Sequence, residues 1–281
     1  MNTKIPKTTE PDGNDFHYRV KKVLTDLGWT VRMSPYYNDS FSEKPREIDI
    51  IAEKAFLPVE NSIYRSTVIV RLFVECKYVA DQTTFWFEER NIEKAKEIVN
   101  LTRSFHETDN NHLVSAGHHY LSGDLIAKLY KTDGKNQDGD PVFKAIHQCL
   151  NATIYYRNNR TDLYEKYNYM SIEELNYPVI VYNSFDKFVK KDTTTEPLTA
   201  DTVTGPFQLE VDYAYTAKGN PKEELFYLDV LSIEMLKDFE EKILLKEINL
   251  AKQKMSDEER RVDLNRMKSG GDSYSDPSSP I

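Results

Sequence analysis

Two apolar segments, residues 46–52 and 68–77, carry charged side chains where a buried strand ordinarily has none. The first reads Arg-Glu-Ile-Asp-Ile-Ile-Ala, and the second ends in Val-Glu-Cys-Lys. Side chains alternate between the two faces of a strand, so Glu75 and Lys77 point the same way while Cys76 points into the opposite layer. Asp49 can share their face. Burying an isolated carboxylate is costly, so these charges indicate a common function where the two strands end.

The composition predicts a globular chain with a substantial core. Its 281 residues are 39% hydrophobic and 12% aromatic, which is enough to support one large or two small domains. The formal net charge is -9 and the pI is near 5.3. No general positive field surrounds such a chain, so any site for a polyanion must be local.

Nothing in the sequence predicts export or membrane insertion. Residues 1–15 are polar and contain no apolar stretch of signal-peptide length, and no run approaches the roughly 20 apolar residues that a membrane helix needs. Cys76 and Cys149 are too few for a disulfide framework and are not spaced as a zinc knuckle. We therefore expect a soluble, cytoplasmic protein.

Hydrophobic periodicity predicts an alternation of helices and strands. The first helix begins near residue 14 and ends at Gly28, and the segment at 35–45 is expected to be a polar loop. Strands are expected at 29–33, 46–52, 68–77, 177–182, 207–215 and 225–231. Further helices are expected at 92–105, 123–130, 140–154 and 232–252.

This alternation favours one α/β domain over residues 14–252, preceded by a flexible N-terminus at 1–13. The first strands follow one another closely and predict an antiparallel meander covered by helices. Residues 253–281 are highly charged and then rich in Ser, Gly, Asp and Pro. Such a segment buries too little apolar surface to offset its chain entropy, so we expect a disordered C-terminal tail.

The residue types in the two charged segments suit a hard divalent cation. Carboxylate oxygens such as those of Asp49 and Glu75 are ligands for Mg²⁺ or Mn²⁺, and the backbone carbonyl of Cys76 could add a third oxygen. Two carboxylates ~4 Å apart repel by about 4 kcal/mol at an effective dielectric constant of about 20, which a bound dication would reverse. Lys77 would lie beside the ion, where it could orient a water, lower the pKa of that water or stabilise a phosphoryl group.

These residues resemble the motif of the PD-(D/E)XK nuclease superfamily, in particular its bacterial restriction-type and anti-phage members. The resemblance covers residues 14–105 and rests on a helix ending near Gly28, on Asp49 in an apolar segment, and on Glu75-Cys76-Lys77 at the end of the next strand. It implies the α/β restriction-endonuclease-like fold, a mixed central sheet flanked by helices. It also implies that Asp49 and Glu75 bind Mg²⁺ and that Lys77 assists the hydrolytic water.

The first helix departs from this pattern. Many relatives carry a Phe-Glu pair that faces the metal, whereas this chain has Phe16-His17. His17 could replace the glutamate, Glu47 or Asp15 could substitute for it, or the site could use one metal with fewer ligands. His17 and Glu47 are therefore accessory candidates.

Other polar groups are weaker candidates. Several basic residues surround the proposed site and suit either phosphate contacts or a solvated helix face, namely Arg19, Lys21, Lys22, Arg32, Lys44 and Arg46. His118 and His119, with nearby His106, Glu107 and His112, lack the His-Glu-x-x-His spacing of a zinc hydrolase, so a polar loop is expected there.

Three functions remain open from sequence. The first is a magnesium-dependent endodeoxyribonuclease that acts on DNA in restriction or phage defence, with no membrane partner, and that forms a homodimer if one site per chain is to cut both strands. The second is a catalytically inactive module of the same fold that binds nucleic acid or another defence-system subunit. The third is a structural subunit whose acidic surface holds a protein partner.

Overall fold

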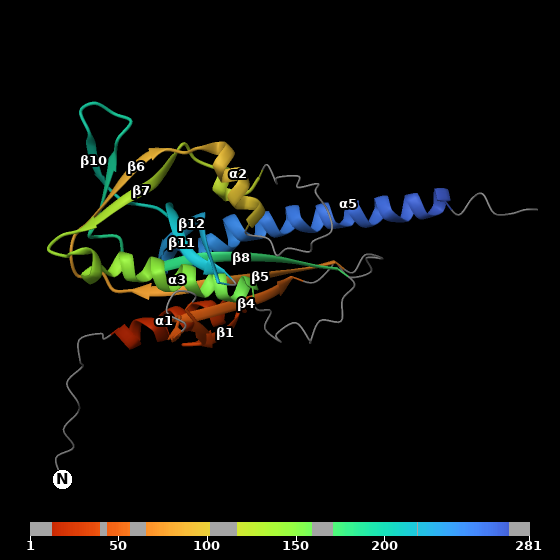
Figure 1. Cartoon of the computed structure of the whole chain (residues 1–281), viewed down its shortest axis with the longest axis horizontal. Helices are drawn as coiled ribbons and strands as arrows, with labels where there is room; N and C mark the ends of the chain where they lie inside the picture. Colours follow the sequence, from red (N-terminus) through yellow and green to blue (C-terminus); the bar gives the residue numbers. More distant parts are fainter. Residues whose placement is uncertain are drawn as a thin grey trace, which may run out of the picture.

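A computed structural model describes residues 13–39, 44–56, 66–101, 117–158, 171–217 and 219–269. Within these residues the chain forms a ten-stranded mixed sheet with helices on both faces (Figure 1), which confirms the α/β class. In spatial order the strands are β1 (Thr30–Met33), β4 (Ile50–Phe56), β5 (Ser66–Lys77), β8 (Ser171–Tyr182), β12 (Asn220–Ser232), β11 (Phe207–Ala217), β7 (Leu125–Thr132), β6 (Thr83–Glu89), β9 (Phe188–Asp192) and β10 (Thr199–Thr202).

The helices divide between the two faces of this sheet. One hydrophobic core joins Phe16, Ile98 and Ile248 of three helices to alternate residues of β5, and the other joins Ile146 to the opposite face of β5. The first face is covered by α1 (Gly13–Asp26), α2 (Ile92–Leu101), α4 (Leu236–Asp238), the π-helical η5 (Phe239–Leu244) and α5 (Leu245–Ser269). The second is covered by α3 (Pro141–Asn158).

The first helix follows directly from its sequence. Phe16, Val20 and Leu24 recur at intervals of four residues and are all buried, because they form one stripe of α1 that faces the sheet. Gly28 ends the helix with a φ of 85°, a left-handed conformation that glycine adopts without a steric cost. The chain then turns directly into β1.

The charged strands lie side by side. β4 pairs with β5 in an antiparallel register in which Ile50 lies opposite Val74, and β1 pairs antiparallel with β4. The expected antiparallel meander is therefore confirmed for β1, β4 and β5. On its other edge β5 pairs in parallel with β8, with Glu75 opposite Ile180, so the ends of β4 and β5 that carry the charges lie inside the sheet and not at its margin.

Several sequence expectations were wrong. Residues 123–130 were expected to be helical, but residues 125–132 form β7, which pairs with β6. The expected loop at 35–45 contains two short strands, β2 (Tyr36–Asn38) and β3 (Pro45–Glu47), which pair as a separate hairpin. The predicted strand at 46–52 is in fact split, because the chain bends at Asp49 between β3 and β4.

The C-terminal region also differs from expectation. Its last helix extends to Ser269 rather than ending near residue 252, and the far end of α5 extends beyond the sheet (Figure 1, blue). Residues 253–269 are therefore helical and not a disordered tail, while residues 1–12, 102–105 and 270–281 lie outside the described residues. None of the described helices combines the length and apolarity required to cross a membrane.

Candidate functional site

Asp49 lies at the bend that precedes β4 and extends the pairing between β4 and β5. Its carboxylate Oδ2 accepts the backbone N–H of Cys76 at 2.8 Å, and Cys76 lies two residues beyond Val74, the last residue of β5 that pairs with β4. The backbone N–H of Asp49 donates in turn to Glu75 Oε1 at 3.3 Å. These two bonds hold the side chains of Asp49 and Glu75 together at the end of β5.

Lys77 completes the group. Its Nζ donates to Glu75 Oε2 at 2.8 Å, because both side chains leave the same face of β5. The structure therefore brings Asp49, Glu75 and Lys77 together, as the sequence predicted. We refer to these three residues, with His17 and Gln148, as the carboxylate cluster.

Burial makes the electrostatics of the cluster unusual. The side chain of Glu75 is fully buried, and this desolvation, opposed by Lys77 and reinforced by Asp49, raises the pKa of its carboxyl to about 8. Burial acts to lower the pKa of the Lys77 ammonium, but the charges of Glu75 and Asp49 outweigh it and leave that pKa above its ordinary value. Burial and Asp49 therefore favour the protonated form of Glu75, whereas the Lys77 ammonium stays charged.

The accessory candidates occupy different places. His17, on α1, has its Nε2 3.4 Å from Asp49 Oδ2, so it faces the carboxylate cluster. Glu47 lies on β3, is exposed, and forms a hydrogen bond with Tyr36 that raises the pKa of that phenol. Asp15 is exposed on α1. Of the three, the structure brings only His17 to the cluster.

Sequence reasoning missed Gln148. This residue lies on α3, and its Oε1 accepts a hydrogen bond from Lys77 Nζ at 3.3 Å. Its amide holds the ammonium from α3. A glutamine in an amphipathic helix gives no local signal of this role, because the contact spans 71 residues of sequence.

The basic residues proposed for nucleic-acid contact do not form one continuous surface of unpaired charges. Lys22 pairs with Asp26 one helical turn away at 2.6 Å, and Arg46 pairs with Asp39 at 2.6 Å. Arg32 is half-buried on β1 and forms a hydrogen bond with Tyr156. The remaining three are on or near the surface around α1 and β3: Arg19, Lys21 and Lys44.

The donor set of the carboxylate cluster fits a hard divalent cation. Each carboxylate oxygen has two lone pairs, so the hydrogen bonds from Cys76 and Lys77 leave acceptor capacity on Asp49 and Glu75. A dication would also offset the burial and the repulsion from Asp49 that raise the pKa of Glu75. The residues that could hold Mg²⁺ or Mn²⁺ are therefore Asp49, Glu75 and the backbone carbonyl of Cys76.

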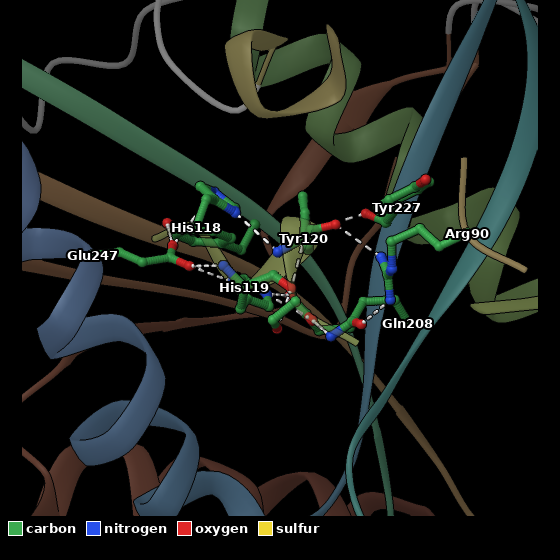
Figure 2. Close-up of polar contacts among 10 residues, drawn as sticks. Arg90, His118, His119, Tyr120, Gln208, Tyr227 and Glu247 are labelled. Carbon is green, nitrogen blue, oxygen red and sulfur yellow. Dashed lines mark hydrogen bonds and ion pairs between the residues drawn. The ribbon is translucent and has the colours of Figure 1, made fainter. Parts of the chain in front are cut away.

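A second polar cluster lies on the first face of the sheet, between the short helix η1 (His119–Leu121) and α5 (Figure 2). His119 Nδ1 contacts Glu247 Oε1 at 2.5 Å, and its Nε2 contacts Asp229 at 2.9 Å. Tyr177 donates to the other oxygen of Glu247 at 2.5 Å. We refer to these residues, with His118, as the histidine cluster.

This arrangement overturns the expectation of a polar loop at His118 and His119, because both rings are buried and stacked. Burial acts to lower the pKa of His119, but Asp229 and Glu247 raise it to about 10. The resulting imidazolium lowers the pKa of Glu247 to about 2, against the effect of burial. His106, Glu107 and His112 lie outside the described residues.

The histidine cluster is also a candidate for metal ligation, since ligand atoms of His118, His119 and Glu247 lie within 4.8 Å of one another. Its hydrogen bonds argue against that use. The backbone N–H of Tyr120 donates to His118 Nδ1 at 3.1 Å, so the proton of a neutral ring is on Nε2, the atom that faces Glu247. The cluster supplies its own counter-charges without an ion.

Comparisons with known proteins add no assignment: no protein-family model, no curated protein and no solved structure matches the chain.

Proposed function

We propose that the chain is a magnesium-dependent endodeoxyribonuclease that hydrolyses phosphodiester bonds at the carboxylate cluster. The observation that carries the proposal is the joint placement of Asp49, Glu75 and Lys77 around one point at the end of β5. A buried ion pair or a capping carboxylate explains each of these residues singly. Neither explains why a second carboxylate is placed against Glu75, where it disfavours ionisation.

Lys77 acts in this proposal as a fixed positive charge. Its raised pKa keeps the ammonium protonated at neutral pH, so it orients the attacking water and stabilises charge on the phosphoryl oxygens rather than accepting a proton. Gln148 and Glu75 hold the ammonium from two sides. Bound Mg²⁺ would supply Lewis acidity at the phosphate and a more acidic water, held by Asp49, Glu75 and the Cys76 carbonyl.

His17 acts as a positioning residue for Asp49. Its ring lies where the resemblance places a glutamate, and its Nε2 faces the oxygen that also accepts from Cys76. A histidine at this point adds no negative charge to the site. The metal shell of this enzyme would therefore hold one carboxylate fewer than that of many relatives.

The arrangement of the strands supports a PD-(D/E)XK assignment. The helix α1, the Asp49 bend before β4 and the Glu75-Cys76-Lys77 end of β5 follow in the order on which the resemblance rests, and β4 and β5 are adjacent. A role in restriction or phage defence, alone or with other subunits, is proposed from that resemblance. Cutting both strands of a duplex with one cluster per chain would require a homodimer.

The alternative is a module that keeps the fold and binds nucleic acid without cutting it. His17 is the specific observation that favours it, because it replaces a metal-facing carboxylate. Calorimetric titration with Mn²⁺ separates the two functions. A binding module without a metal site shows no heat of Mn²⁺ binding that is lost when Asp49 is replaced.

The principal test is nicking of supercoiled plasmid with and without Mg²⁺. We expect wild type to nick only with the metal, and Lys77→Ala to lose nicking. Lys237→Ala is the matched control, because Lys237 is exposed on α4 and pairs only loosely with Glu241 at 3.8 Å. Equal nicking by wild type and Lys77→Ala would reject the proposal and identify a contaminating nuclease.

A further inference from the structure

A hollow opens beside the carboxylate cluster, between α3 and β11. It consists of two adjoining cavities of about 750 Å³ and about 480 Å³, which share the same wall residues. We call it the aromatic pocket and define it by Asp39, Arg46, Phe143, His147, Asn151 and Tyr213. These volumes lie within the range of pockets that enclose a small organic ligand.

The walls of the pocket are aromatic and already fixed in place. The rings of Phe143 and His147 have centroids 4.2 Å apart, and the ring of Tyr213 meets His147 edge-on at 5.2 Å. His147 Nδ1 is also hydrogen-bonded to the Tyr213 hydroxyl at 3.0 Å. Such walls suit a flat ring system, which they can hold by stacking.

The floor carries hydrogen-bonding groups. Tyr37 lines the smaller cavity and is 1% exposed, and its hydroxyl has no hydrogen-bond partner in the part of the chain that the structure describes. Buried polar atoms without partners are uncommon in folded proteins, and a hydroxyl that lines a cavity is available to a ligand there. Asn151, also buried, adds an amide with both donor and acceptor atoms.

The charges of the pocket disfavour a phosphate as its occupant. Arg46 is paired with Asp39 at 2.6 Å, and Lys128, at the edge of the larger cavity, lies 3.2 Å from Glu88 and 3.8 Å from Glu210. Asp212 also lines the larger cavity. A neutral ring with polar edges fits this balance better than an anion does.

The pocket is placed next to the reaction. Gln148 lines the smaller cavity and is also the residue that holds Lys77. A ligand in the pocket therefore lies one side chain away from the proposed cleavage point.

We propose that the aromatic pocket binds one nucleobase of the strand that is cut, turned out of the duplex beside the scissile phosphate. This inference rests on the proposed nuclease function and names how its substrate is engaged. A base inside a duplex is stacked between its neighbours, so an enclosed pocket can hold it only after it is extruded, and a flipped base is then held by stacking and by hydrogen bonds to its edge. The pocket offers both kinds of contact.

The first experiment measures binding of free deoxynucleosides, with deoxyribose 5-phosphate as the probe that lacks a base. We expect the nucleosides to bind and the sugar phosphate not to bind. Phe143→Ala should weaken nucleoside binding by about 5- to 150-fold, the loss that corresponds to one stacking wall. Phe143 is half-buried at the start of α3, and Leu129→Ala is the matched control, since Leu129 is exposed on the opposite face of β7 from the pocket residue Tyr130.

The second experiment uses duplexes that carry 2-aminopurine, whose fluorescence reports unstacking, with the Lys77→Ala protein so that no cutting occurs. We expect a fluorescence change at one position near the cleavage point, absent with Lys77→Ala/Phe143→Ala and retained with Lys77→Ala/Leu129→Ala. No change at any position, while wild type nicks plasmid, would overturn the base-binding inference and leave the nuclease intact. If the protein binds nucleosides but never nicks plasmid, the proposal that a base of the cut strand occupies the pocket is overturned. The pocket would then be a site for free nucleosides.

Discussion

The carboxylate cluster and the histidine cluster each bring two carboxylates together, yet their charges are balanced in different ways. In the histidine cluster the side chains of His119, Asp229 and Glu247 are at most 7% exposed, and the imidazolium lies between the two acids. In the carboxylate cluster, Asp49 and Lys77 remain 17% and 18% exposed, and Glu75, although paired with Lys77, is buried so deeply that the pKa of its carboxyl is raised. One cluster is complete and sealed, whereas the other is incomplete and reachable from solvent.

This difference indicates which cluster has a structural role. The contacts of His119 join η1 to β12 and α5, elements that are far apart in sequence, and they satisfy both ring nitrogens. Arg90 extends the network by donating to Gln208 and to the backbone of Tyr120, as Figure 2 shows. A network whose charges are paired internally stabilises the fold. A network with too few positive charges for its carboxylates is suited to bind a cation.

The largest expected effect is on protein stability, and it tests the structural role of the histidine cluster. His119→Gln removes the cation and leaves two buried carboxylates, so the free energy of unfolding should fall by about 3–5 kcal/mol near pH 6. The raised pKa of His119 gives stability that is fully present below pH 6.5 and is lost as the pH rises through about 10. The loss measured by chemical denaturation should therefore shrink between pH 6.5 and 10, and an equal loss at both ends would contradict a charged His119.

The second prediction separates them by activity. Lys77→Ala should lower the plasmid-nicking rate by about 10²–10³-fold, equivalent to ~2.7–4 kcal/mol, because one preorganised charge at the phosphate is lost. His119→Gln, assayed where it remains folded and corrected for the folded fraction, should keep the wild-type rate. A comparable loss in both variants would place the chemistry elsewhere or link the two clusters.

A third measurement asks which cluster takes a cation. Mn²⁺ at about 100 times its dissociation constant should raise the free energy of unfolding by about 2.7 kcal/mol. Asp49→Asn should abolish this gain, whereas His118→Gln, which changes the other candidate metal group, should preserve it. The reverse pattern would move the metal site to the histidine cluster.

The last expected effect is a slope with pH, which is smaller than the other effects over any single pH unit. The carboxyl of Glu75 changes its pKa from 4.5 to about 8 on folding, so wild type loses stability through this group as the pH rises from about 4.5 to 8. Glu75→Gln cannot ionise and lacks that loss. The stability of the variant relative to wild type, without metal, should therefore increase by up to about 1.4 kcal/mol per pH unit across this window, and a flat difference would show that Glu75 titrates normally.

The sequence predicted the parts of the molecule that depend on neighbouring residues. The apolar stripe of α1 and the alternation along β5 are local patterns, and the nearness of Asp49 and Glu75 follows once β4 and β5 pair across a short connection. The departure at His17 could also be recognised from sequence, because it lies within the motif. The sequence left His17, Glu47 and Asp15 open as replacements for the glutamate, and the structure shows that His17 contacts Asp49.

Contacts between distant segments account for what the sequence did not predict. The apolar residues at 125–132 fit a short helix as well as a strand, and pairing with β6 and β11 decides the outcome. The partners of His119 lie 110 and 128 residues away, so its ring has no local sign of burial. The aromatic pocket draws on α3, β11 and the residues around β2 and β3, which no single window of sequence contains.

The register of β5 has a consequence for how this chain can vary. Alternate residues of β5 fill the core on the α1 face, and Glu75 and Lys77 occupy the opposite alternation that faces α3. Deleting or inserting one residue between Val68 and Val74 would exchange the residues on the two faces of β5. Glu75 and Lys77 would then point toward the core under α1, and valines would replace them at the carboxylate cluster. A change in the length of this strand would therefore disrupt the core and the carboxylate cluster together, whereas a substitution leaves the alternation of faces intact.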